Sequence, residues 1–217
     1  MKLDLATALF PENRVDGLMI CGIKWGGEPY RPQEPQLPSF FSDALVNSYR
    51  FRNRLLRWFE LWGHPLVTER GHEGPFERSI SHMNWLPDQA RSVRGRDIWT
   101  ECVAHRQRFL RYAATLKPKA ILFCGLTLLR ALNTPECLRG AEELFGRFSD
   151  PRFLRKDVGE SGRLLKRFTF GFQVFERCQV LGVPHPTGSI GLSDAYVAAF
   201  RSEIEPILCG LRQDPNA

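Results

Sequence analysis

The chain has 217 residues, enough for one domain with a well-buried core. No run approaches the roughly 18–20 apolar residues of a membrane span, and the N-terminus lacks the long apolar segment of a signal peptide, so we expect a cytoplasmic protein with no membrane partner. The formal net charge is +6, and the basic residues are 24 Arg and 6 Lys. Because a planar guanidinium suits phosphate contact, nucleic acid is the leading partner class, with a GC-rich coding bias toward Arg as the alternative.

The six cysteines are scattered without any Cys-x-x-Cys pair. This pattern favours neither a disulfide framework nor an iron–sulfur cluster. Cys102 and His105 have a spacing that could bind a metal on a helix, but no second pair with ligand spacing accompanies them. We therefore do not expect a metal site at these residues.

The N-terminal half predicts a strand, a glycine-rich loop and a helix. Residues 17–22 form a short apolar run that ends at a glycine, and glycines 26 and 27 follow closely. Residues 40–62 carry apolar side chains at three- and four-residue steps, interleaved with arginines, which predicts an amphipathic helix with a basic face.

The middle of the chain alternates strand and helix signals. Residues 80–87 predict a strand that ends at an Asn-Trp step before a proline, and Asp97 is placed to cap a helix through Leu116. The near-continuous apolar run 119–125 is typical of a parallel strand covered on both faces, and a short helix is expected over 127–132.

The C-terminal part begins with a polar, charge-rich stretch, 133–165, which we interpret as an insertion outside the core. Residues 168–183 predict a β-hairpin, and Ser193 is placed to cap a closing helix to about Leu211. Alternating strands and helices predict a single α/β domain over 1–217, a three-layer α/β/α sandwich with a mainly parallel central sheet.

The segment 183–189 places His185 between Pro184 and Pro186, directly after an apolar run. Each proline fixes its own φ and biases the preceding residue toward extended geometry, so the backbone aims the imidazole. Such a histidine suits donation of a hydrogen bond to developing charge. The alternative is a proline-rich turn with a surface histidine.

Three predicted strand ends carry unusual residues: the segment 22–27, Asn84 and His185. The carboxyl ends of parallel strands meet at one edge of a sheet, so these residues are expected to line one cleft. A strand-end turn cap is the alternative role for Asn84.

In these motifs and their order, the chain resembles the uracil-DNA glycosylase superfamily. His185-Pro186-Thr187-Gly188-Ser189 is similar to the family's His-Pro-Ser-Pro motif, and Gly22-Ile23-Lys24-Trp25-Gly26 is similar to its first glycine-containing motif. The resemblance covers most of the chain. It implies a uracil-DNA glycosylase-like fold and excision of a flipped base from DNA by hydrolysis of the N-glycosidic bond, without metal or cofactor.

The resemblance also implies roles for individual residues. His185 stabilises the departing anionic base, Asn84 reads its amide edge, and Ile190 or Leu192 is the wedge. The residues expected to line the substrate site are Gly22, Ile23, Trp25, Gly26, Gly27 and Glu28. The residues expected to contact DNA beside the wedge are Thr187, Gly188 and Ser189.

This chain departs from the family at Lys24, where many members have an acid or an amide, and at Trp25 in place of proline. Lys24 is therefore a third candidate catalytic residue, which could grip a phosphate, stabilise the base or attack C1′ as an amine. Asn84 could orient the water, or a carboxylate could activate it; the candidates are Glu28, Asp88 and Asp194.

Gly26 stands where the uracil-selective class has a tyrosine that excludes a 5-methyl group. The missing side chain favours a damaged or 5-substituted base as substrate, such as a modified pyrimidine of phage DNA. We expect the protein to be a monomer. Two other functions remain open: a catalytically silent nucleic-acid-binding module on the same fold, and a nucleoside or nucleotide hydrolase.

Overall fold

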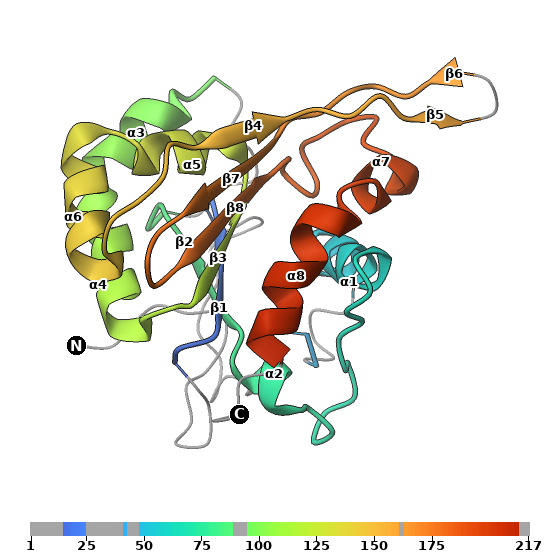
Figure 1. Cartoon of the computed structure of the whole chain (residues 1–217), viewed down its shortest axis with the longest axis horizontal. Coiled ribbons are helices and arrows are strands. Elements are labelled where there is room, and N and C mark those ends of the chain that lie inside the picture. Colours follow the sequence, from blue (N-terminus) through green and yellow to red (C-terminus); the bar gives the residue numbers. More distant parts are fainter. Residues whose placement is uncertain (1–14, 25–40, 43–47, 89–94, 161–162, 213–217) are drawn as a thin grey trace.

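The computed structural model describes residues 15–24, 41–42, 48–88, 95–160 and 163–212. Within them, a six-stranded sheet has the order β2-β1-β3-β8-β7-β4 (Figure 1). Its strands are β1 (Leu18–Gly22), β2 (Ser81–Asn84), β3 (Ala120–Cys124), β4 (Arg152–Leu154), β7 (Phe170–Val174) and β8 (Gln179–Val183). A separate two-stranded ribbon consists of β5 (Gly159–Glu160) and β6 (Arg163–Leu164).

The four strands β2, β1, β3 and β8 are parallel, and β7 and β4 extend the sheet in antiparallel pairings. Every residue of β1 and β3 is buried, as their continuous apolar sequences predict for strands covered on both faces. The expected mainly parallel sheet and the expected β7–β8 hairpin are both confirmed.

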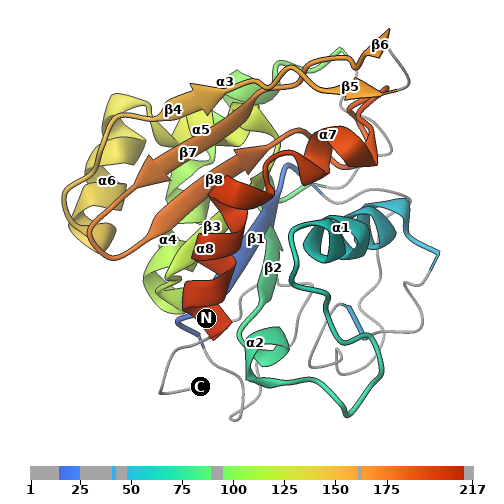
Figure 2. The same cartoon turned by 45° about the vertical axis from the view of Figure 1, so that its right-hand side comes forward.

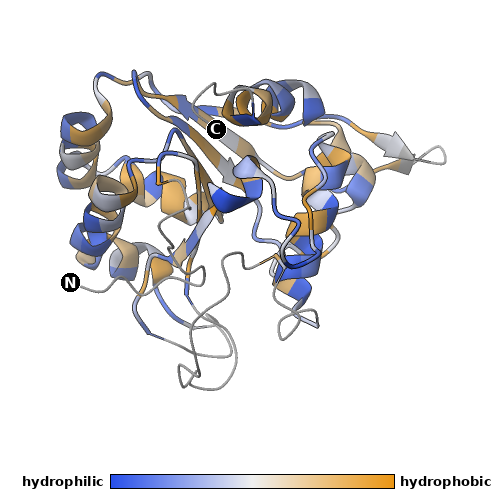
Figure 3. Cartoon of the chain, turned by 90° about the horizontal axis from the view of Figure 1, so that it is seen from below, coloured by the Kyte–Doolittle hydropathy of each residue, from blue (hydrophilic) through white to orange (hydrophobic). Residues whose placement is uncertain are grey.

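Helices cover both faces of the sheet (Figure 2). One face packs against α3 (Ile98–Ala104), α4 (Arg106–Leu116), α5 (Leu126–Leu132) and α6 (Pro135–Phe145). The other packs against α1 (Arg50–Leu61), α2 (Pro75–Arg78), α7 (Asp194–Ala198) and α8 (Arg201–Arg212). Figure 3 shows that these helices carry both hydrophobic and hydrophilic residues, as expected for helices with one buried side. The described residues thus form one sheet with a layer of helices on each face.

The predicted helix caps are confirmed, but two predicted helices are each divided. Asp97 accepts the Thr100 N–H, and Ser193 accepts the Tyr196 N–H. The helix expected over 97–116 breaks at His105, whose ψ of 14° is not helical, into α3 and α4. The closing helix is likewise divided into α7 and α8.

The stretch 133–165 differs from the expected insertion outside the core. Helix α6 contributes Cys137, Ala141 and Phe145 to the core, and β4 is the edge strand of the main sheet. The polar residues of α6 occupy its outer face, which explains why this stretch looks like an insertion in sequence. Only the part that carries β5 and β6 extends beyond the sheet (Figure 1).

All six cysteines are free, and five of them are buried. Among the described residues, none of the helices combines the length and apolar character needed to cross a bilayer.

Candidate functional site at the carboxyl edge of the sheet

Gly22 and Asn84 are paired residues at the carboxyl ends of β1 and β2. The Asn84 side chain is buried, and its Oδ1 occupies the space that a Cβ on residue 22 would need. Glycine at position 22 therefore makes room for the amide. This placement brings together two of the residues that the sequence assigned to the substrate site.

The two chains continue side by side beyond the strands. The N–H of Trp85 donates to the carbonyl of Gly22 at 2.9 Å, and the N–H of Leu86 donates to that of Ile23 at 2.9 Å. Ile23 is nearly buried and also lies against Gly125, which follows β3. These bonds fix the position of Asn84 through its neighbours on both strands.

His185 follows β8 at the same edge, and the turn after it folds back onto its ring. Nδ1 accepts the backbone N–H of Gly188 at 3.0 Å and that of Thr187 at 3.3 Å. A nitrogen that accepts hydrogen bonds carries no proton, so these bonds assign the proton of the neutral ring to Nε2. A Cβ on Gly188 would lie only 3.3 Å from Nδ1, so the close approach favours glycine there.

Phe51 on α1 connects His185 to β2. Its ring stacks on His82 with centroids 5.4 Å apart and lies 6.0 Å from the His185 ring. His82 and Asn84 are two residues apart on one strand, so they face the same side of the sheet. Phe51 thus connects His185 to the face of β2 that carries both His82 and Asn84.

Phe51 and His82 are two residues of this edge that the sequence motifs do not predict. The period-two alternation of strand residues marks His82 as sharing the Asn84 face. Burial lowers the pKa of His82 to about 4, and it also lowers the pKa of His185 below its ordinary value. Both rings are therefore neutral at pH 7, which agrees with the hydrogen-bonding pattern of His185.

Lys24 lies close to a network of charges formed by Arg96, Asp88 and Glu101. Arg96 pairs with Asp88 and donates to Glu101, with Nε 2.8 Å from Oε1. Burial, together with the positive charge of Arg96, lowers the pKa of Lys24. The hydrogen bond from Arg96 lowers the pKa of Asp88, so this carboxylate is ionised but is already bound to Arg96.

Asp194, a second candidate for activating water, is also engaged. Its Oδ2 lies 2.8 Å from Nε of Arg57 on α1. Both carboxylates that the sequence proposed as bases and that the structure describes are therefore ion-paired. The third, Glu28, lies outside the described residues, as do Trp25, Gly26 and Gly27.

The loop after the His185 turn separates the two candidate wedge residues. Ile190 is 85% exposed, whereas Leu192 is 4% exposed and packs in the core with α1 and α7. The Leu192 side chain is therefore part of the core and is not presented to DNA, which leaves Ile190 as the predicted wedge. Arg54 donates to the Leu192 carbonyl and fixes this end of the loop. Thr187, Gly188 and Ser189 form the turn itself.

Several of the arginines that the sequence offers for phosphate contact are used within the protein itself. Arg52 is buried and donates to the carbonyl of Phe41, and Arg108 lies over the Tyr112 ring at 4.7 Å. Arg108 also donates to the Asn84 carbonyl at 3.4 Å. Part of the arginine content is therefore structural, and the number of arginines in the sequence overstates the positive charge presented to phosphates.

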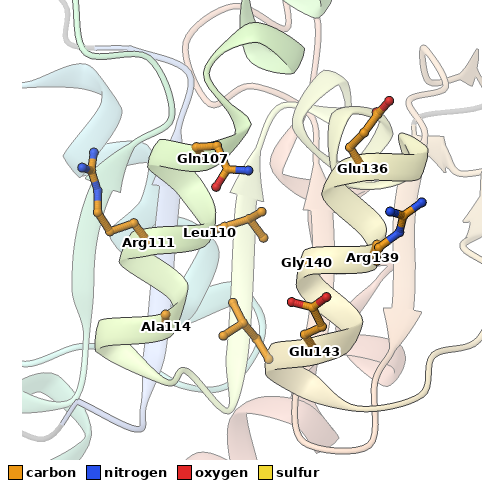
Figure 4. Close-up of a pocket in the computed structure, with 9 residues that line it drawn as sticks. Gln107, Leu110, Arg111, Ala114, Glu136, Arg139, Gly140 and Glu143 are labelled. Atoms are coloured by element: carbon orange, nitrogen blue, oxygen red, sulfur yellow. The ribbon is translucent and has the colours of Figure 1, made fainter.

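A surface groove lies between α4 and α6 (Figure 4). Gly140 lets the two helices approach, because a Cβ there would press on Leu110. Both signs of charge line the groove, including Arg111, Arg139 and Glu143. It contains none of the predicted site residues, and its mixed charge does not favour a polyanion.

The described residues contain no group of three or more His, Cys, Asp or Glu side chains placed to hold a metal ion. No protein-family model matches the chain, and no curated protein is significantly similar to it.

Proposed function

We propose that this protein is a DNA glycosylase of the uracil-DNA glycosylase type, which flips a damaged or modified base out of DNA and hydrolyses its N-glycosidic bond. The observation that carries the proposal is the His185 turn. Because Nδ1 accepts two backbone N–H groups, the Nε2–H remains as a donor on an aimed, neutral ring. The neutral ring already carries this N–H, so it can donate a hydrogen bond to negative charge as that charge develops.

In the proposed reaction, the bond between C1′ and the base breaks and its electron pair leaves with the base. His185 Nε2–H donates to the base oxygen on which that charge collects. The Asn84 amide, placed by Gly22, pairs with the donor and acceptor edge of the base. Water then adds to C1′, and its proton neutralises the departing base.

Lys24 is proposed to hold a phosphate or to stabilise the leaving base. Its burial and the nearby Arg96 disfavour its charge, and an anion beside it would offset that cost. The absence of a side chain at Gly26 supports a 5-substituted pyrimidine as substrate. Exposed Ile190 supplies the apolar wedge that fills the gap in the stack.

The second candidate is a catalytically silent module that binds nucleic acid. The pairing of Asp88 with Arg96 and of Asp194 with Arg57 favours it, because neither carboxylate is free to accept a proton from water.

One experiment separates the two functions. Duplex oligonucleotides that carry uracil, hypoxanthine, a thymine mismatch or a 5-modified cytosine are incubated with the protein and then cleaved by alkali at abasic sites. We expect cleavage with at least one substrate and its loss in His185→Ala. Binding to all of them without cleavage would favour the silent module.

A further inference from the structure

Residues 155–160 and 163–167, which we name the arm, extend from β4 and return to β7 (Figures 1 and 2). The arm carries β5 and β6, which pair in antiparallel fashion. Its sequence has five basic residues against two acidic ones. The charged side chains of this projecting ribbon do not contribute to the core, so a role in binding would account for them better than a role in folding.

The root of the arm is fixed to the body. The hydroxyl of Tyr196 donates to the Phe168 carbonyl at 2.7 Å and accepts the Lys156 N–H at 3.1 Å, so one side chain holds both chains of the ribbon. Lys156 also pairs with Glu203 on α8 at 2.8 Å. The direction of the arm is therefore set by α7 and α8.

The side chains of the arm divide between two sides. Val158 and Leu165 pack against the core, whereas Leu164 is 78% exposed. Leu164 and Ile190 are the two most exposed large hydrophobic side chains among the described residues. Burial in the core does not account for Leu164, which is exposed among basic residues. Contact of its side chain with a sugar or a base edge would account for it.

Lys166 joins the arm to the loop that carries the candidate wedge. Its Nζ donates to the Ile190 carbonyl at 3.1 Å, and its Cδ lies against Gly191. Arg155 donates to the Thr169 hydroxyl at 2.7 Å. Within the described part of the chain, neither Lys166 nor Arg155 forms a salt bridge with a carboxylate, so both charges are available to an anion.

We propose that the arm binds duplex DNA on one side of the flipped nucleotide, with Arg155 and Lys166 on phosphates and Leu164 against the groove. The proposal rests on the proposed function for the position of the flipped nucleotide. Positive charge, an exposed apolar residue and direct contact with the Ile190 loop all favour DNA as the occupant.

The test compares two double variants that each remove two positive charges. Arg155→Ala with Lys166→Ala changes the arm. Arg139→Ala with Arg177→Ala is the control, because both side chains are exposed and both lie outside the arm, Arg139 on α6 and Arg177 in the turn between β7 and β8. Like Lys166, Arg177 also donates a hydrogen bond to a backbone carbonyl. Binding to an undamaged duplex is measured by fluorescence anisotropy over a range of salt concentrations.

We expect the arm variant to bind about tenfold more weakly at low salt and to reduce the slope of log affinity against log salt by about 2, since two phosphate contacts are lost. The control should match the wild type. Equal affinities and slopes for the two double variants would overturn the proposal, as would a wild-type protein that does not bind duplex DNA.

Leu164→Asp and Val174→Asp give a second comparison, because both positions are exposed and Val174 is the last residue of β7, outside the arm. Only Leu164→Asp should weaken binding. A change in sedimentation of the Leu164 variant without a change in DNA affinity would instead make the arm a contact between copies. DNA binding is measured without excision, so a protein that excises no base can still show weaker binding in the arm variant. An enzyme that excises a base but binds DNA equally well in both double variants would overturn the proposal for the arm and leave the proposed function standing.

Discussion

The Asn84 amide lies across the Cα of Gly22, at paired positions on neighbouring parallel strands. The two residues are far apart in sequence, yet each determines what the other position tolerates. A side chain at position 22 would need the space that Asn84 Oδ1 occupies. The proposed base-reading amide therefore depends on a glycine that itself carries no functional group.

Gly22→Ala should displace the Asn84 side chain. We expect a loss of about 1–3 kcal/mol in the free energy of unfolding, the usual cost of overpacking, and a loss of at least about tenfold in single-turnover excision by the folded protein. Gly210→Ala is the control, because a Cβ there meets nothing within 4 Å, and it should stabilise α8 by roughly 0.5–1 kcal/mol. Urea unfolding and single-turnover rates measure both effects, and an unchanged rate in Gly22→Ala would separate Asn84 from the chemistry.

His185→Ala should reduce excision by roughly 10²–10³-fold, the scale for losing one donor to a developing anion, and leave DNA binding nearly unchanged. His185→Gln retains a side-chain N–H and should retain more activity than the alanine variant. Single-turnover rates at saturating enzyme make the comparison. Equal rates for wild type and His185→Ala would remove this residue from the site.

Much of this arrangement follows from sequence-level physics. Continuous apolar runs mark β1 and β3 as doubly covered strands, and parallel strands bring Gly22, Asn84 and His185 to one edge. The prolines around His185 mark a stiff turn, but the acceptance of two N–H groups by Nδ1 depends on how residues 187 and 188 fold back. Local sequence carries no such information.

Other features depend on tertiary packing. An apolar residue in a loop can be a wedge or part of the core, and only packing against α1 and α7 assigns Leu192 to the core. The helical pattern of 40–62 predicts a helix but does not place Phe51 between His82 and His185. The arginines of the sequence do not reveal that Arg52 is buried and that Arg96 is paired with Asp88.

His82 should make stability sensitive to acid. Its pKa is about 4 in the folded protein and near the ordinary value of 6.5 when unfolded, so only the unfolded chain binds the proton between these values. The free energy of unfolding should therefore fall as pH decreases from 6.5 through 4, by about 3 kcal/mol from this residue. The stabilising contribution is fully present above pH 6.5.

Urea unfolding at several pH values measures this dependence. His82→Gln should flatten the pH slope by that amount, whatever its effect at neutral pH. Parallel slopes for wild type and His82→Gln would show that the ring is protonated in the folded protein.

Ile190 and Leu192 offer the last comparison, because two similar side chains two residues apart have opposite environments. Ile190→Ala should change the free energy of unfolding by less than about 0.5 kcal/mol, since the side chain is 85% exposed. Leu192→Ala should cost about 2–5 kcal/mol, because it empties a core position. Urea unfolding measures both values.

The same two variants separate base flipping from folding. Ile190→Ala should slow excision from duplex DNA, where a wedge must replace the flipped base in the stack, and leave excision from a single strand unchanged. Leu192→Ala should keep the wild-type ratio of duplex to single-strand rates when assayed well below its melting temperature. If Ile190→Ala also keeps that ratio, the exposed isoleucine is not the wedge and base flipping depends on another residue.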